Sequence, residues 1–235
     1  MTSCLLRLIV ILMAPVWASA APLQAVPAGD YRPLRAAQAE PLQEGFEAAW
    51  LAALGEQLGN EIALVETAVH PDLRIGAVAA GTVYFSSEIA ALAAAEAGPG
   101  QWADLDGEPF CVTAGSPHAE VVASRFGGIA RVYPSAAQAL IGLKLGECRA
   151  VVDDRLLLEQ IAVLPEWRRY NRLLTLPDEA VSPLRVDASD AALQQRIEHL
   201  IASKHGQQAL ADITQHWIDE VAFQAYVLAD TLDCH

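Results

Sequence analysis

Strands and helices alternate regularly along residues 109–162. The apolar runs PFCVT, ARVYP and CRAVVDD are each followed by an amphipathic stretch of ten to twelve residues. The second of these stretches begins at Ser135, a favoured N-cap residue, and ends at Gly146, a favoured helix stop. Such alternation is typical of βαβ units, in which helices pack on the faces of a parallel sheet. The order of elements therefore predicts an α/β domain.

The first half of the chain is less regular. Phe46, Trp50, Leu54 and Leu58 recur at every fourth position and Gly59 follows them, which predicts an amphipathic helix. EIALVE then reads as a strand. The long alanine-rich run over 73–95 suits helix and strand equally, apart from a strand-like centre at 83–85. AGPGQW, at 97–102, is a break and a candidate linker between domains.

The N-terminus has the composition of a secretory signal peptide. Arg7 precedes a short apolar run that ends at Trp17, and Ala-Ser-Ala follows at 18–20. We expect cleavage after Ala20, because the run is too short to cross a bilayer. Export permits disulfides.

Three cysteines remain beyond residue 20. Cys111 and Cys148 both flank strand-like runs, so we expect them to pair and Cys234 to stay free; three unpaired thiols are the alternative. No C-x-x-C motif supports redox chemistry.

The charge balance excludes several classes of partner. The formal net charge is -14, with 15 Lys+Arg against 29 Asp+Glu, so binding to nucleic acid or to an anionic membrane surface is disfavoured. The six histidines show neither an H-E-x-x-H motif nor a Cys/His cluster. We therefore expect no metal site and no cofactor.

The stretch VTAGSPHAE holds the first candidate site. A strand that ends at Gly115 and runs into a helix at Ser116 leaves backbone N–H groups and a partial positive charge facing outward. A carboxylate or phosphate fits such a position, although Ser116 could instead be only a helix cap. A serine nucleophile is disfavoured because Pro117 removes an N–H of an oxyanion hole and His118, two positions on, does not face Ser116.

Asp154 ends the strand AVVDD and holds the second candidate site. A carboxylate at the carboxyl end of a strand is placed to bind a ligand ammonium group, while the alternative is an N-cap for the helix that follows. Asp153 takes this role if the register differs by one residue. Tyr31, Tyr84 and Phe85 are candidate aromatic walls of a cleft, with ordinary core packing as the alternative.

The order of local motifs resembles one family. The stretches that carry the resemblance are DYRPL, GFEAAWLAALGEQLG, WADLDGEPFCVTAGSPHAE, YPSAAQALIGLKLGECRAVVDD and DAALQQRIEHLIASKHGQQALADITQHW. They look like the successive segments of type 2 periplasmic solute-binding proteins of the amino-acid type (family 3). The resemblance covers most of residues 28–220.

The resemblance implies a two-lobed α/β fold with parallel-sheet lobes joined by a two-crossing hinge. Residues 21–95 and 183–235 would form lobe 1, and residues 96–182 lobe 2. It implies a non-catalytic, monomeric protein that binds a small polar ligand between the lobes, with a ligand set of Tyr31, Tyr84, Phe85, Thr113, Gly115, Ser116 and Asp154. The implied partner is the permease of an ABC transporter, and the alternative is an accessory or sensor module of a periplasmic enzyme system.

Two departures from the family pattern stand out. Between Val65 and Tyr84 the chain is shorter than the family pattern by about one helix and one strand. Arg74 is the only arginine in this segment, and the family's T-x-E-R stretch, whose arginine binds a ligand carboxylate, is missing. Arg149 stands where the family's G-r-v-D motif has an aspartate. An enzyme on the same fold would need an acid/base pair in the cleft, which spacing alone does not reveal.

Overall fold

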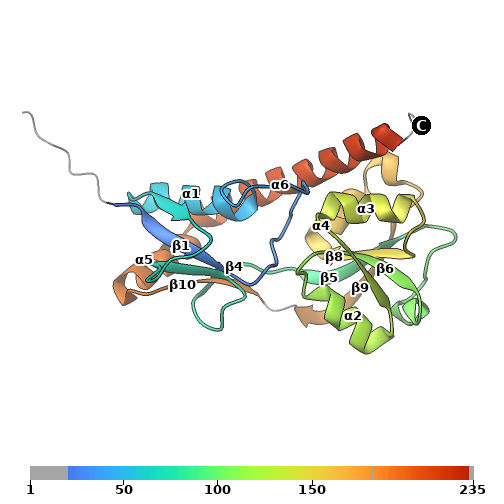
Figure 1. Cartoon of the computed structure of the whole chain (residues 1–235), viewed down its shortest axis with the longest axis horizontal. Coiled ribbons are helices and arrows are strands. Elements are labelled where there is room, and N and C mark those ends of the chain that lie inside the picture. Colours follow the sequence, from blue (N-terminus) through green and yellow to red (C-terminus); the bar gives the residue numbers. More distant parts are fainter. Residues whose placement is uncertain (1–20, 181–182, 233–235) are drawn as a thin grey trace, which may run out of the picture.

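The computed structural model describes residues 21–180 and 183–232, so the predicted signal peptide and Cys234 lie outside the described residues. Two five-stranded sheets form two lobes that lie side by side (Figure 1). The sheet of lobe 1 has the order β2-β1-β3-β10-β4, and that of lobe 2 the order β7-β6-β8-β5-β9. The predicted two-lobed α/β fold is confirmed.

The strands of lobe 1 are β1 (Leu23–Ala28), β2 (Ile62–Leu64), β3 (Leu73–Gly76), β4 (Thr82–Phe85) and β10 (Leu184–Ala188). Those of lobe 2 are β5 (Glu88–Ala93), β6 (Pro109–Thr113), β7 (Ile129–Tyr133), β8 (Ala150–Asp154) and β9 (Arg172–Ala180). The α-helices are α1 (Phe46–Leu58), α2 (His118–Phe126), α3 (Ala136–Lys144), α4 (Arg155–Ala162), α5 (Ala191–Ala202) and α6 (Lys204–Leu232), and two 3-10 turns are η1 (Trp102–Leu105) and η2 (Pro165–Trp167).

Lobe 2 follows the predicted alternation. β6 pairs in parallel with both β7 and β8, and α2 and α3 occupy the connections expected from the sequence. Ser135 caps α3 through a hydrogen bond that its hydroxyl accepts from the N–H of Gln138, as predicted. The disulfide between Cys111 and Cys148 is also confirmed, with a Cα–Cα distance of 5.7 Å.

Two expectations about the lobes are wrong. The sheets are mixed rather than parallel. In lobe 2, β5 pairs antiparallel with β8 and β9, and in lobe 1, β10 pairs antiparallel with β3 and β4. The first crossing lies at 86–87, not near 95, because the alanine-rich run splits into β3, β4 and β5 and the last of these joins the sheet of lobe 2. Successive side chains of β5 lie on opposite faces of the sheet, and both faces are buried, which explains the near-continuous apolar run.

Lobe 1 is reduced as the sequence predicts. Residues 65–72 connect β2 to β3 without a helix. Along β3, the side chains of Leu73 and Ile75 are fully buried and that of Arg74 is exposed, and β10 alternates in the same way. Such alternation is typical of a sheet that packs on the core with one face only. The helices α1, α5 and α6 contribute to that single core.

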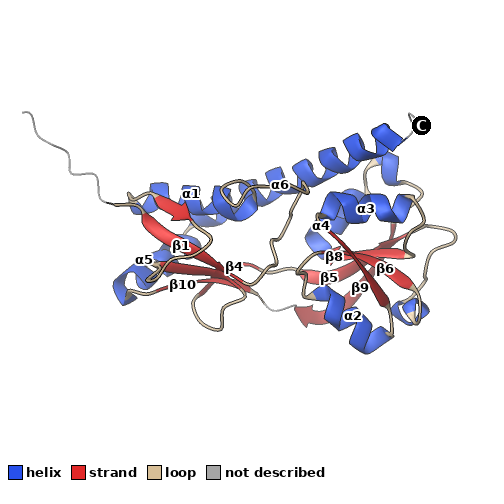
Figure 2. Ribbon diagram, in the orientation of Figure 1, coloured by secondary structure: helices blue, strands red, loops and turns tan. Residues whose placement is uncertain are grey.

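Helix α6 joins the two lobes. Its 29 residues give a length of about 43 Å at 1.5 Å per residue. It contacts α1 and α5 of lobe 1 and α3 and α4 of lobe 2, and Figures 1 and 2 show it running along both lobes. The expected assignment of residues 183–235 to lobe 1 is therefore incomplete, since the helix also packs on lobe 2. Among the described residues, no helix is both long and apolar enough to span a membrane.

Candidate functional site

Polar side chains from both lobes meet in a buried cluster, which we call the polar centre: Tyr31, Thr113, His118, Asp153 and Asp154. The Tyr31 hydroxyl donates to Asp154 Oδ2 at 2.8 Å, and His118 Nε2 lies 3.1 Å from Asp154 Oδ1. The Asp154 side chain is therefore held between a phenol that follows β1 and an imidazole at the start of α2.

Asp153 completes the polar centre. Its carboxylate accepts hydrogen bonds from the Thr113 hydroxyl, at 3.1 Å, and from the backbone N–H of Asp154, at 2.8 Å. His118 is fully buried, and Asp153 and Asp154 are each 3% exposed. The carboxyl ends of β6 and β8, which are neighbours in the sheet, bring these groups together.

Burial and close charges change the proton affinities of the polar centre. Burial raises the pKa of the Asp153 carboxyl to about 6, and the Asp154 charge adds to this shift, while His118 opposes it. Burial by itself would lower the pKa of His118, but the hydrogen bond to Asp154 and the charges of both aspartates outweigh it and raise that pKa. The pKa of Tyr31 is raised well above 10, first by burial and then by Asp154, so its hydroxyl keeps its proton and donates.

The connection between β1 and α1, residues 29–45, crosses to lobe 2, and we call it the strap. The Arg35 carbonyl accepts a hydrogen bond from the N–H of Ala136, at 2.9 Å, and the side chains of Gln38 and Gln138 are joined at 3.0 Å. Leu34 is 2% exposed and has a φ of 56°. A non-glycine residue keeps such a backbone conformation only where its surroundings hold it in place.

The strap covers the predicted anion cradle. Gly115 has a φ of 75°, and a Cβ at this position would lie 2.7 Å from the backbone of Asp30 and Tyr31. Only glycine allows this approach. The backbone of the strap thus occupies the space beside Gly115, where a ligand carboxylate was expected.

Five of the seven predicted ligand residues come together here: Tyr31, Thr113, Gly115, Ser116 and Asp154. The Ser116 hydroxyl accepts a hydrogen bond at 3.3 Å from the N–H of His118, the first residue of α2, while the N-cap position itself is occupied by Pro117. Asp154 occupies the N-cap position of α4, as the alternative interpretation expected, but its side chain makes no capping hydrogen bond there.

Tyr84 and Phe85 lie apart from the polar centre. Tyr84 stacks on Trp50, with ring centroids 4.3 Å apart, and Phe85 meets Phe46 edge-on. Both line a largely apolar cavity of about 470 Å³ beside α4 and α6. They are therefore walls of a cavity, but not of the one that contains Asp154.

Sequence reasoning missed His118 and treated Asp153 only as a substitute for Asp154. We expected His118 to turn away from Ser116, and its ring instead meets a carboxylate from another strand. His118, Asp153 and Asp154 each offer one ligand atom within 4.8 Å of the others. The spacing of the histidines in the sequence did not reveal this group of potential metal ligands, because the fold brings together residues 35 positions apart along the chain.

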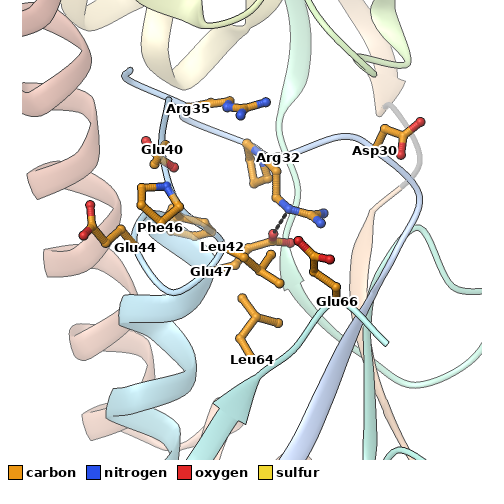
Figure 3. A pocket seen from close by; sticks show the side chains of 12 residues that line it. Asp30, Arg32, Arg35, Glu40, Leu42, Glu44, Phe46, Glu47, Leu64 and Glu66 are labelled. Atoms are coloured by element: carbon orange, nitrogen blue, oxygen red, sulfur yellow. Dashed lines mark ion pairs between the residues drawn. The ribbon is translucent and has the colours of Figure 1, made fainter. Parts of the chain in front are cut away.

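A second cavity, of about 330 Å³, is lined by residues of the strap, the start of α1 and the end of β2 (Figure 3). Acidic side chains outnumber basic ones in its lining by five to two. The charged lining residues are Asp30, Arg32, Arg35, Glu40, Glu44, Glu47 and Glu66. We call this space the lobe 1 cavity.

Glu47 is the buried acid of the lobe 1 cavity, with 4% of its surface exposed. Its Oε1 accepts a hydrogen bond from the Tyr84 hydroxyl at 2.5 Å. Its Oε2 lies 3.4 Å from Arg32 Nε, an ion pair drawn in Figure 3, but accepts no hydrogen bond. Burial raises the pKa of the Glu47 carboxyl, while the Tyr84 hydrogen bond and the Arg32 charge oppose the shift.

Comparison with solved structures identifies the fold. No protein-family model matches the chain, and neither does any curated protein. A substrate-binding protein of an amino acid ABC transporter superposes with a TM-score of 0.57 at 14% identity, over 84% of this chain and 99% of that one. The chain has the two-lobed fold of the periplasmic binding proteins.

Two further neighbours have the same fold. The arginine-, lysine-, histidine-binding protein ArtJ from Geobacillus stearothermophilus has a TM-score of 0.59 at 14% identity, over 84% of this chain and 95% of that one. The GluR0 ligand-binding core in complex with L-glutamate has a TM-score of 0.56 at 19% identity, over 86% of this chain and the whole of that one.

Proposed function

We propose that this protein is a non-catalytic periplasmic solute-binding protein that holds a small cationic, amino-acid-like solute in the lobe 1 cavity, for delivery to an ABC transporter. The observation that carries the proposal is Glu47: a buried carboxylate that lines the cavity and whose Oε2 has the Arg32 ion pair but no hydrogen-bond donor among the described residues. A buried acceptor left unsatisfied costs about 1–3 kcal/mol, which a ligand N–H group would recover.

The charges of the cavity favour a cation. An excess of carboxylates over guanidinium groups favours a ligand that carries an ammonium or guanidinium group. Arg35 lines the same cavity and supplies a cationic group for a ligand carboxylate, in the absence of the T-x-E-R arginine of family 3. A volume of about 330 Å³ suits a ligand of this size, and two structural neighbours, an ancestral cationic amino acid solute-binding protein and ArtJ, are binding proteins for cationic amino acids.

Ligand-linked stabilisation tests the proposal. We expect L-arginine, L-lysine, agmatine or putrescine to raise the unfolding temperature, since a ligand at a hundredfold excess over its Kd stabilises the folded state by about 2.7 kcal/mol. Glu47→Gln should remove most of the shift. Glu61→Gln, at an exposed position outside the cavity, is the matched control. A stable protein that responds to none of these compounds would refute the proposal.

A second candidate function is favoured by α6 and the strap. Binding proteins that close on a ligand need lobes that rotate about their crossings, whereas here one helix packs on both lobes and the strap fills the space beside Gly115. Both features suit an accessory module that presents a fixed surface to a periplasmic partner. Stoichiometric co-purification of one partner, together with no response to any solute, would favour this function over solute binding.

A further inference from the structure

The side chains of the polar centre play no part in the solute binding proposed for the lobe 1 cavity. We propose that His118, Asp153 and Asp154 bind one divalent first-row transition-metal ion, with Zn²⁺ as the first choice, and that this ion fastens the strap to lobe 2. The proposal does not depend on the proposed function, because the metal ligands all belong to lobe 2 and do not line the lobe 1 cavity.

The geometry of the three side chains suits a metal ion. Ligand atoms that each lie about 2.1 Å from an ion are separated from one another by about 3.0–3.4 Å. His118 Nε2 and Asp154 Oδ1 are already 3.1 Å apart, and an oxygen of Asp153 lies within 4.8 Å of both partners' ligand atoms. Small rotations of the Asp153 side chain would complete the site.

The charges of the centre also suit a divalent ion. Two adjacent carboxylates are buried together, and buried charges are costly unless they are balanced. A protonated His118 would balance one of them. A divalent ion with a neutral imidazole balances both.

The orientation of the histidine is a separate observation. His118 is fully buried, and its Nδ1 has no hydrogen-bond partner among the described residues. The ring therefore makes its polar contact through Nε2, which is directed at the carboxylates. This contact joins Nε2 to Asp154 Oδ1 at 3.1 Å, and it places the nitrogen where a neutral imidazole could donate its lone pair to an ion held by that carboxylate.

The donor set indicates which ions fit. Imidazole favours Zn²⁺ and its first-row neighbours, and carboxylates accept these ions as well as Mn²⁺, whereas Mg²⁺ and Ca²⁺ favour sites made of oxygens alone. Thr113 donates to Asp153 and Tyr31 donates to Asp154, so both carboxylates are already oriented by hydrogen bonds. Through Tyr31, the bound ion would hold the strap on lobe 2.

Elemental analysis tests the site directly. The full chain, expressed with export and purified without a polyhistidine tag, is expected to carry close to one equivalent of zinc. After removal of the metal with a chelator, added Zn²⁺ should restore the higher unfolding temperature, and Mg²⁺ and Ca²⁺ should not. Co²⁺ should bind in place of Zn²⁺ and give a visible absorption band.

Variants separate this site from surface binding. His118→Asn and Asp153→Asn should each weaken Zn²⁺ binding at least tenfold, while His199→Asn, at an exposed position on α5, should leave it unchanged. Wild-type protein that is folded but takes up no ion would overturn the proposal, as would equal binding by wild type and Asp153→Asn. The wild-type measurement decides the question even where a variant fails to fold.

Discussion

Replacement of Tyr31 by phenylalanine tests the contact between the strap and lobe 2. The substitution removes a single hydroxyl group and keeps the ring. That hydroxyl donates to Asp154 Oδ2 at 2.8 Å, and no other hydrogen bond to this oxygen was found among the described residues. Because Asp154 is 3% exposed, water does not readily take the place of the lost donor.

The expected cost follows from this geometry. A hydrogen bond to a charged group contributes about 1.5–3 kcal/mol, and part of the loss comes from a buried oxygen left unsatisfied. We expect Tyr31→Phe to lower the free energy of unfolding by about 2 kcal/mol. For a chain of this size, that loss corresponds to a fall of about 4–8 °C in Tm.

Urea unfolding at pH 7.5, followed by circular dichroism, measures the difference. Tyr226→Phe is the matched control, since Tyr226 is 54% exposed on α6, and it should change stability by less than about 0.5 kcal/mol. Proton exchange of backbone amides in the strap should also rise in the Tyr31 variant, because the strap loses a contact with lobe 2. Equal stability of wild type and Tyr31→Phe would show that the polar centre does not hold the strap, and would refute this reasoning.

Three further predictions concern the disulfide, Glu47 and α6. Serine at Cys148 should cost roughly 4 kcal/mol in thermal or urea unfolding, because the disulfide with Cys111 spans 37 residues; a loss under about 1 kcal/mol would contradict the loop-closure argument. The folded-state pKa of Glu47 is raised above 4.5, so its favourable contribution is full below pH 4.5 and is lost as the pH rises through the folded value. The stability of wild type relative to Glu47→Gln should therefore fall as the pH rises above 4.5 in urea titrations, and a constant difference would refute the assigned pKa shift. Ala225→Glu, which places a charge at a fully buried position of α6, should cost at least about 3 kcal/mol by the same assay, against less than about 1 kcal/mol for Tyr226→Glu; similar costs would show that α6 does not pack as described.

Local patterns predicted much of this structure. Three features could be predicted because they depend on residues close in sequence. They are the helical period of α1, the serine cap of α3 and the alternation of strands with helices in lobe 2. The pairing of Cys111 with Cys148 also follows, because both flank strands that become neighbours in a parallel sheet. The alanine-rich run over 73–95 stayed ambiguous, because apolar residues buried on both faces of a sheet show no period.

The sequence by itself therefore predicted a two-lobed α/β fold and most of its helices, and it named Tyr31 and Asp154 among the candidate ligand residues. Tertiary structure alone decided that the strap covers Gly115, that His118 faces two aspartates and that α6 packs on both lobes. The physical reason is the same in each case. These contacts join residues far apart in the chain, and their geometry depends on how strand ends and helices from separate segments are packed, which no local pattern of residues records.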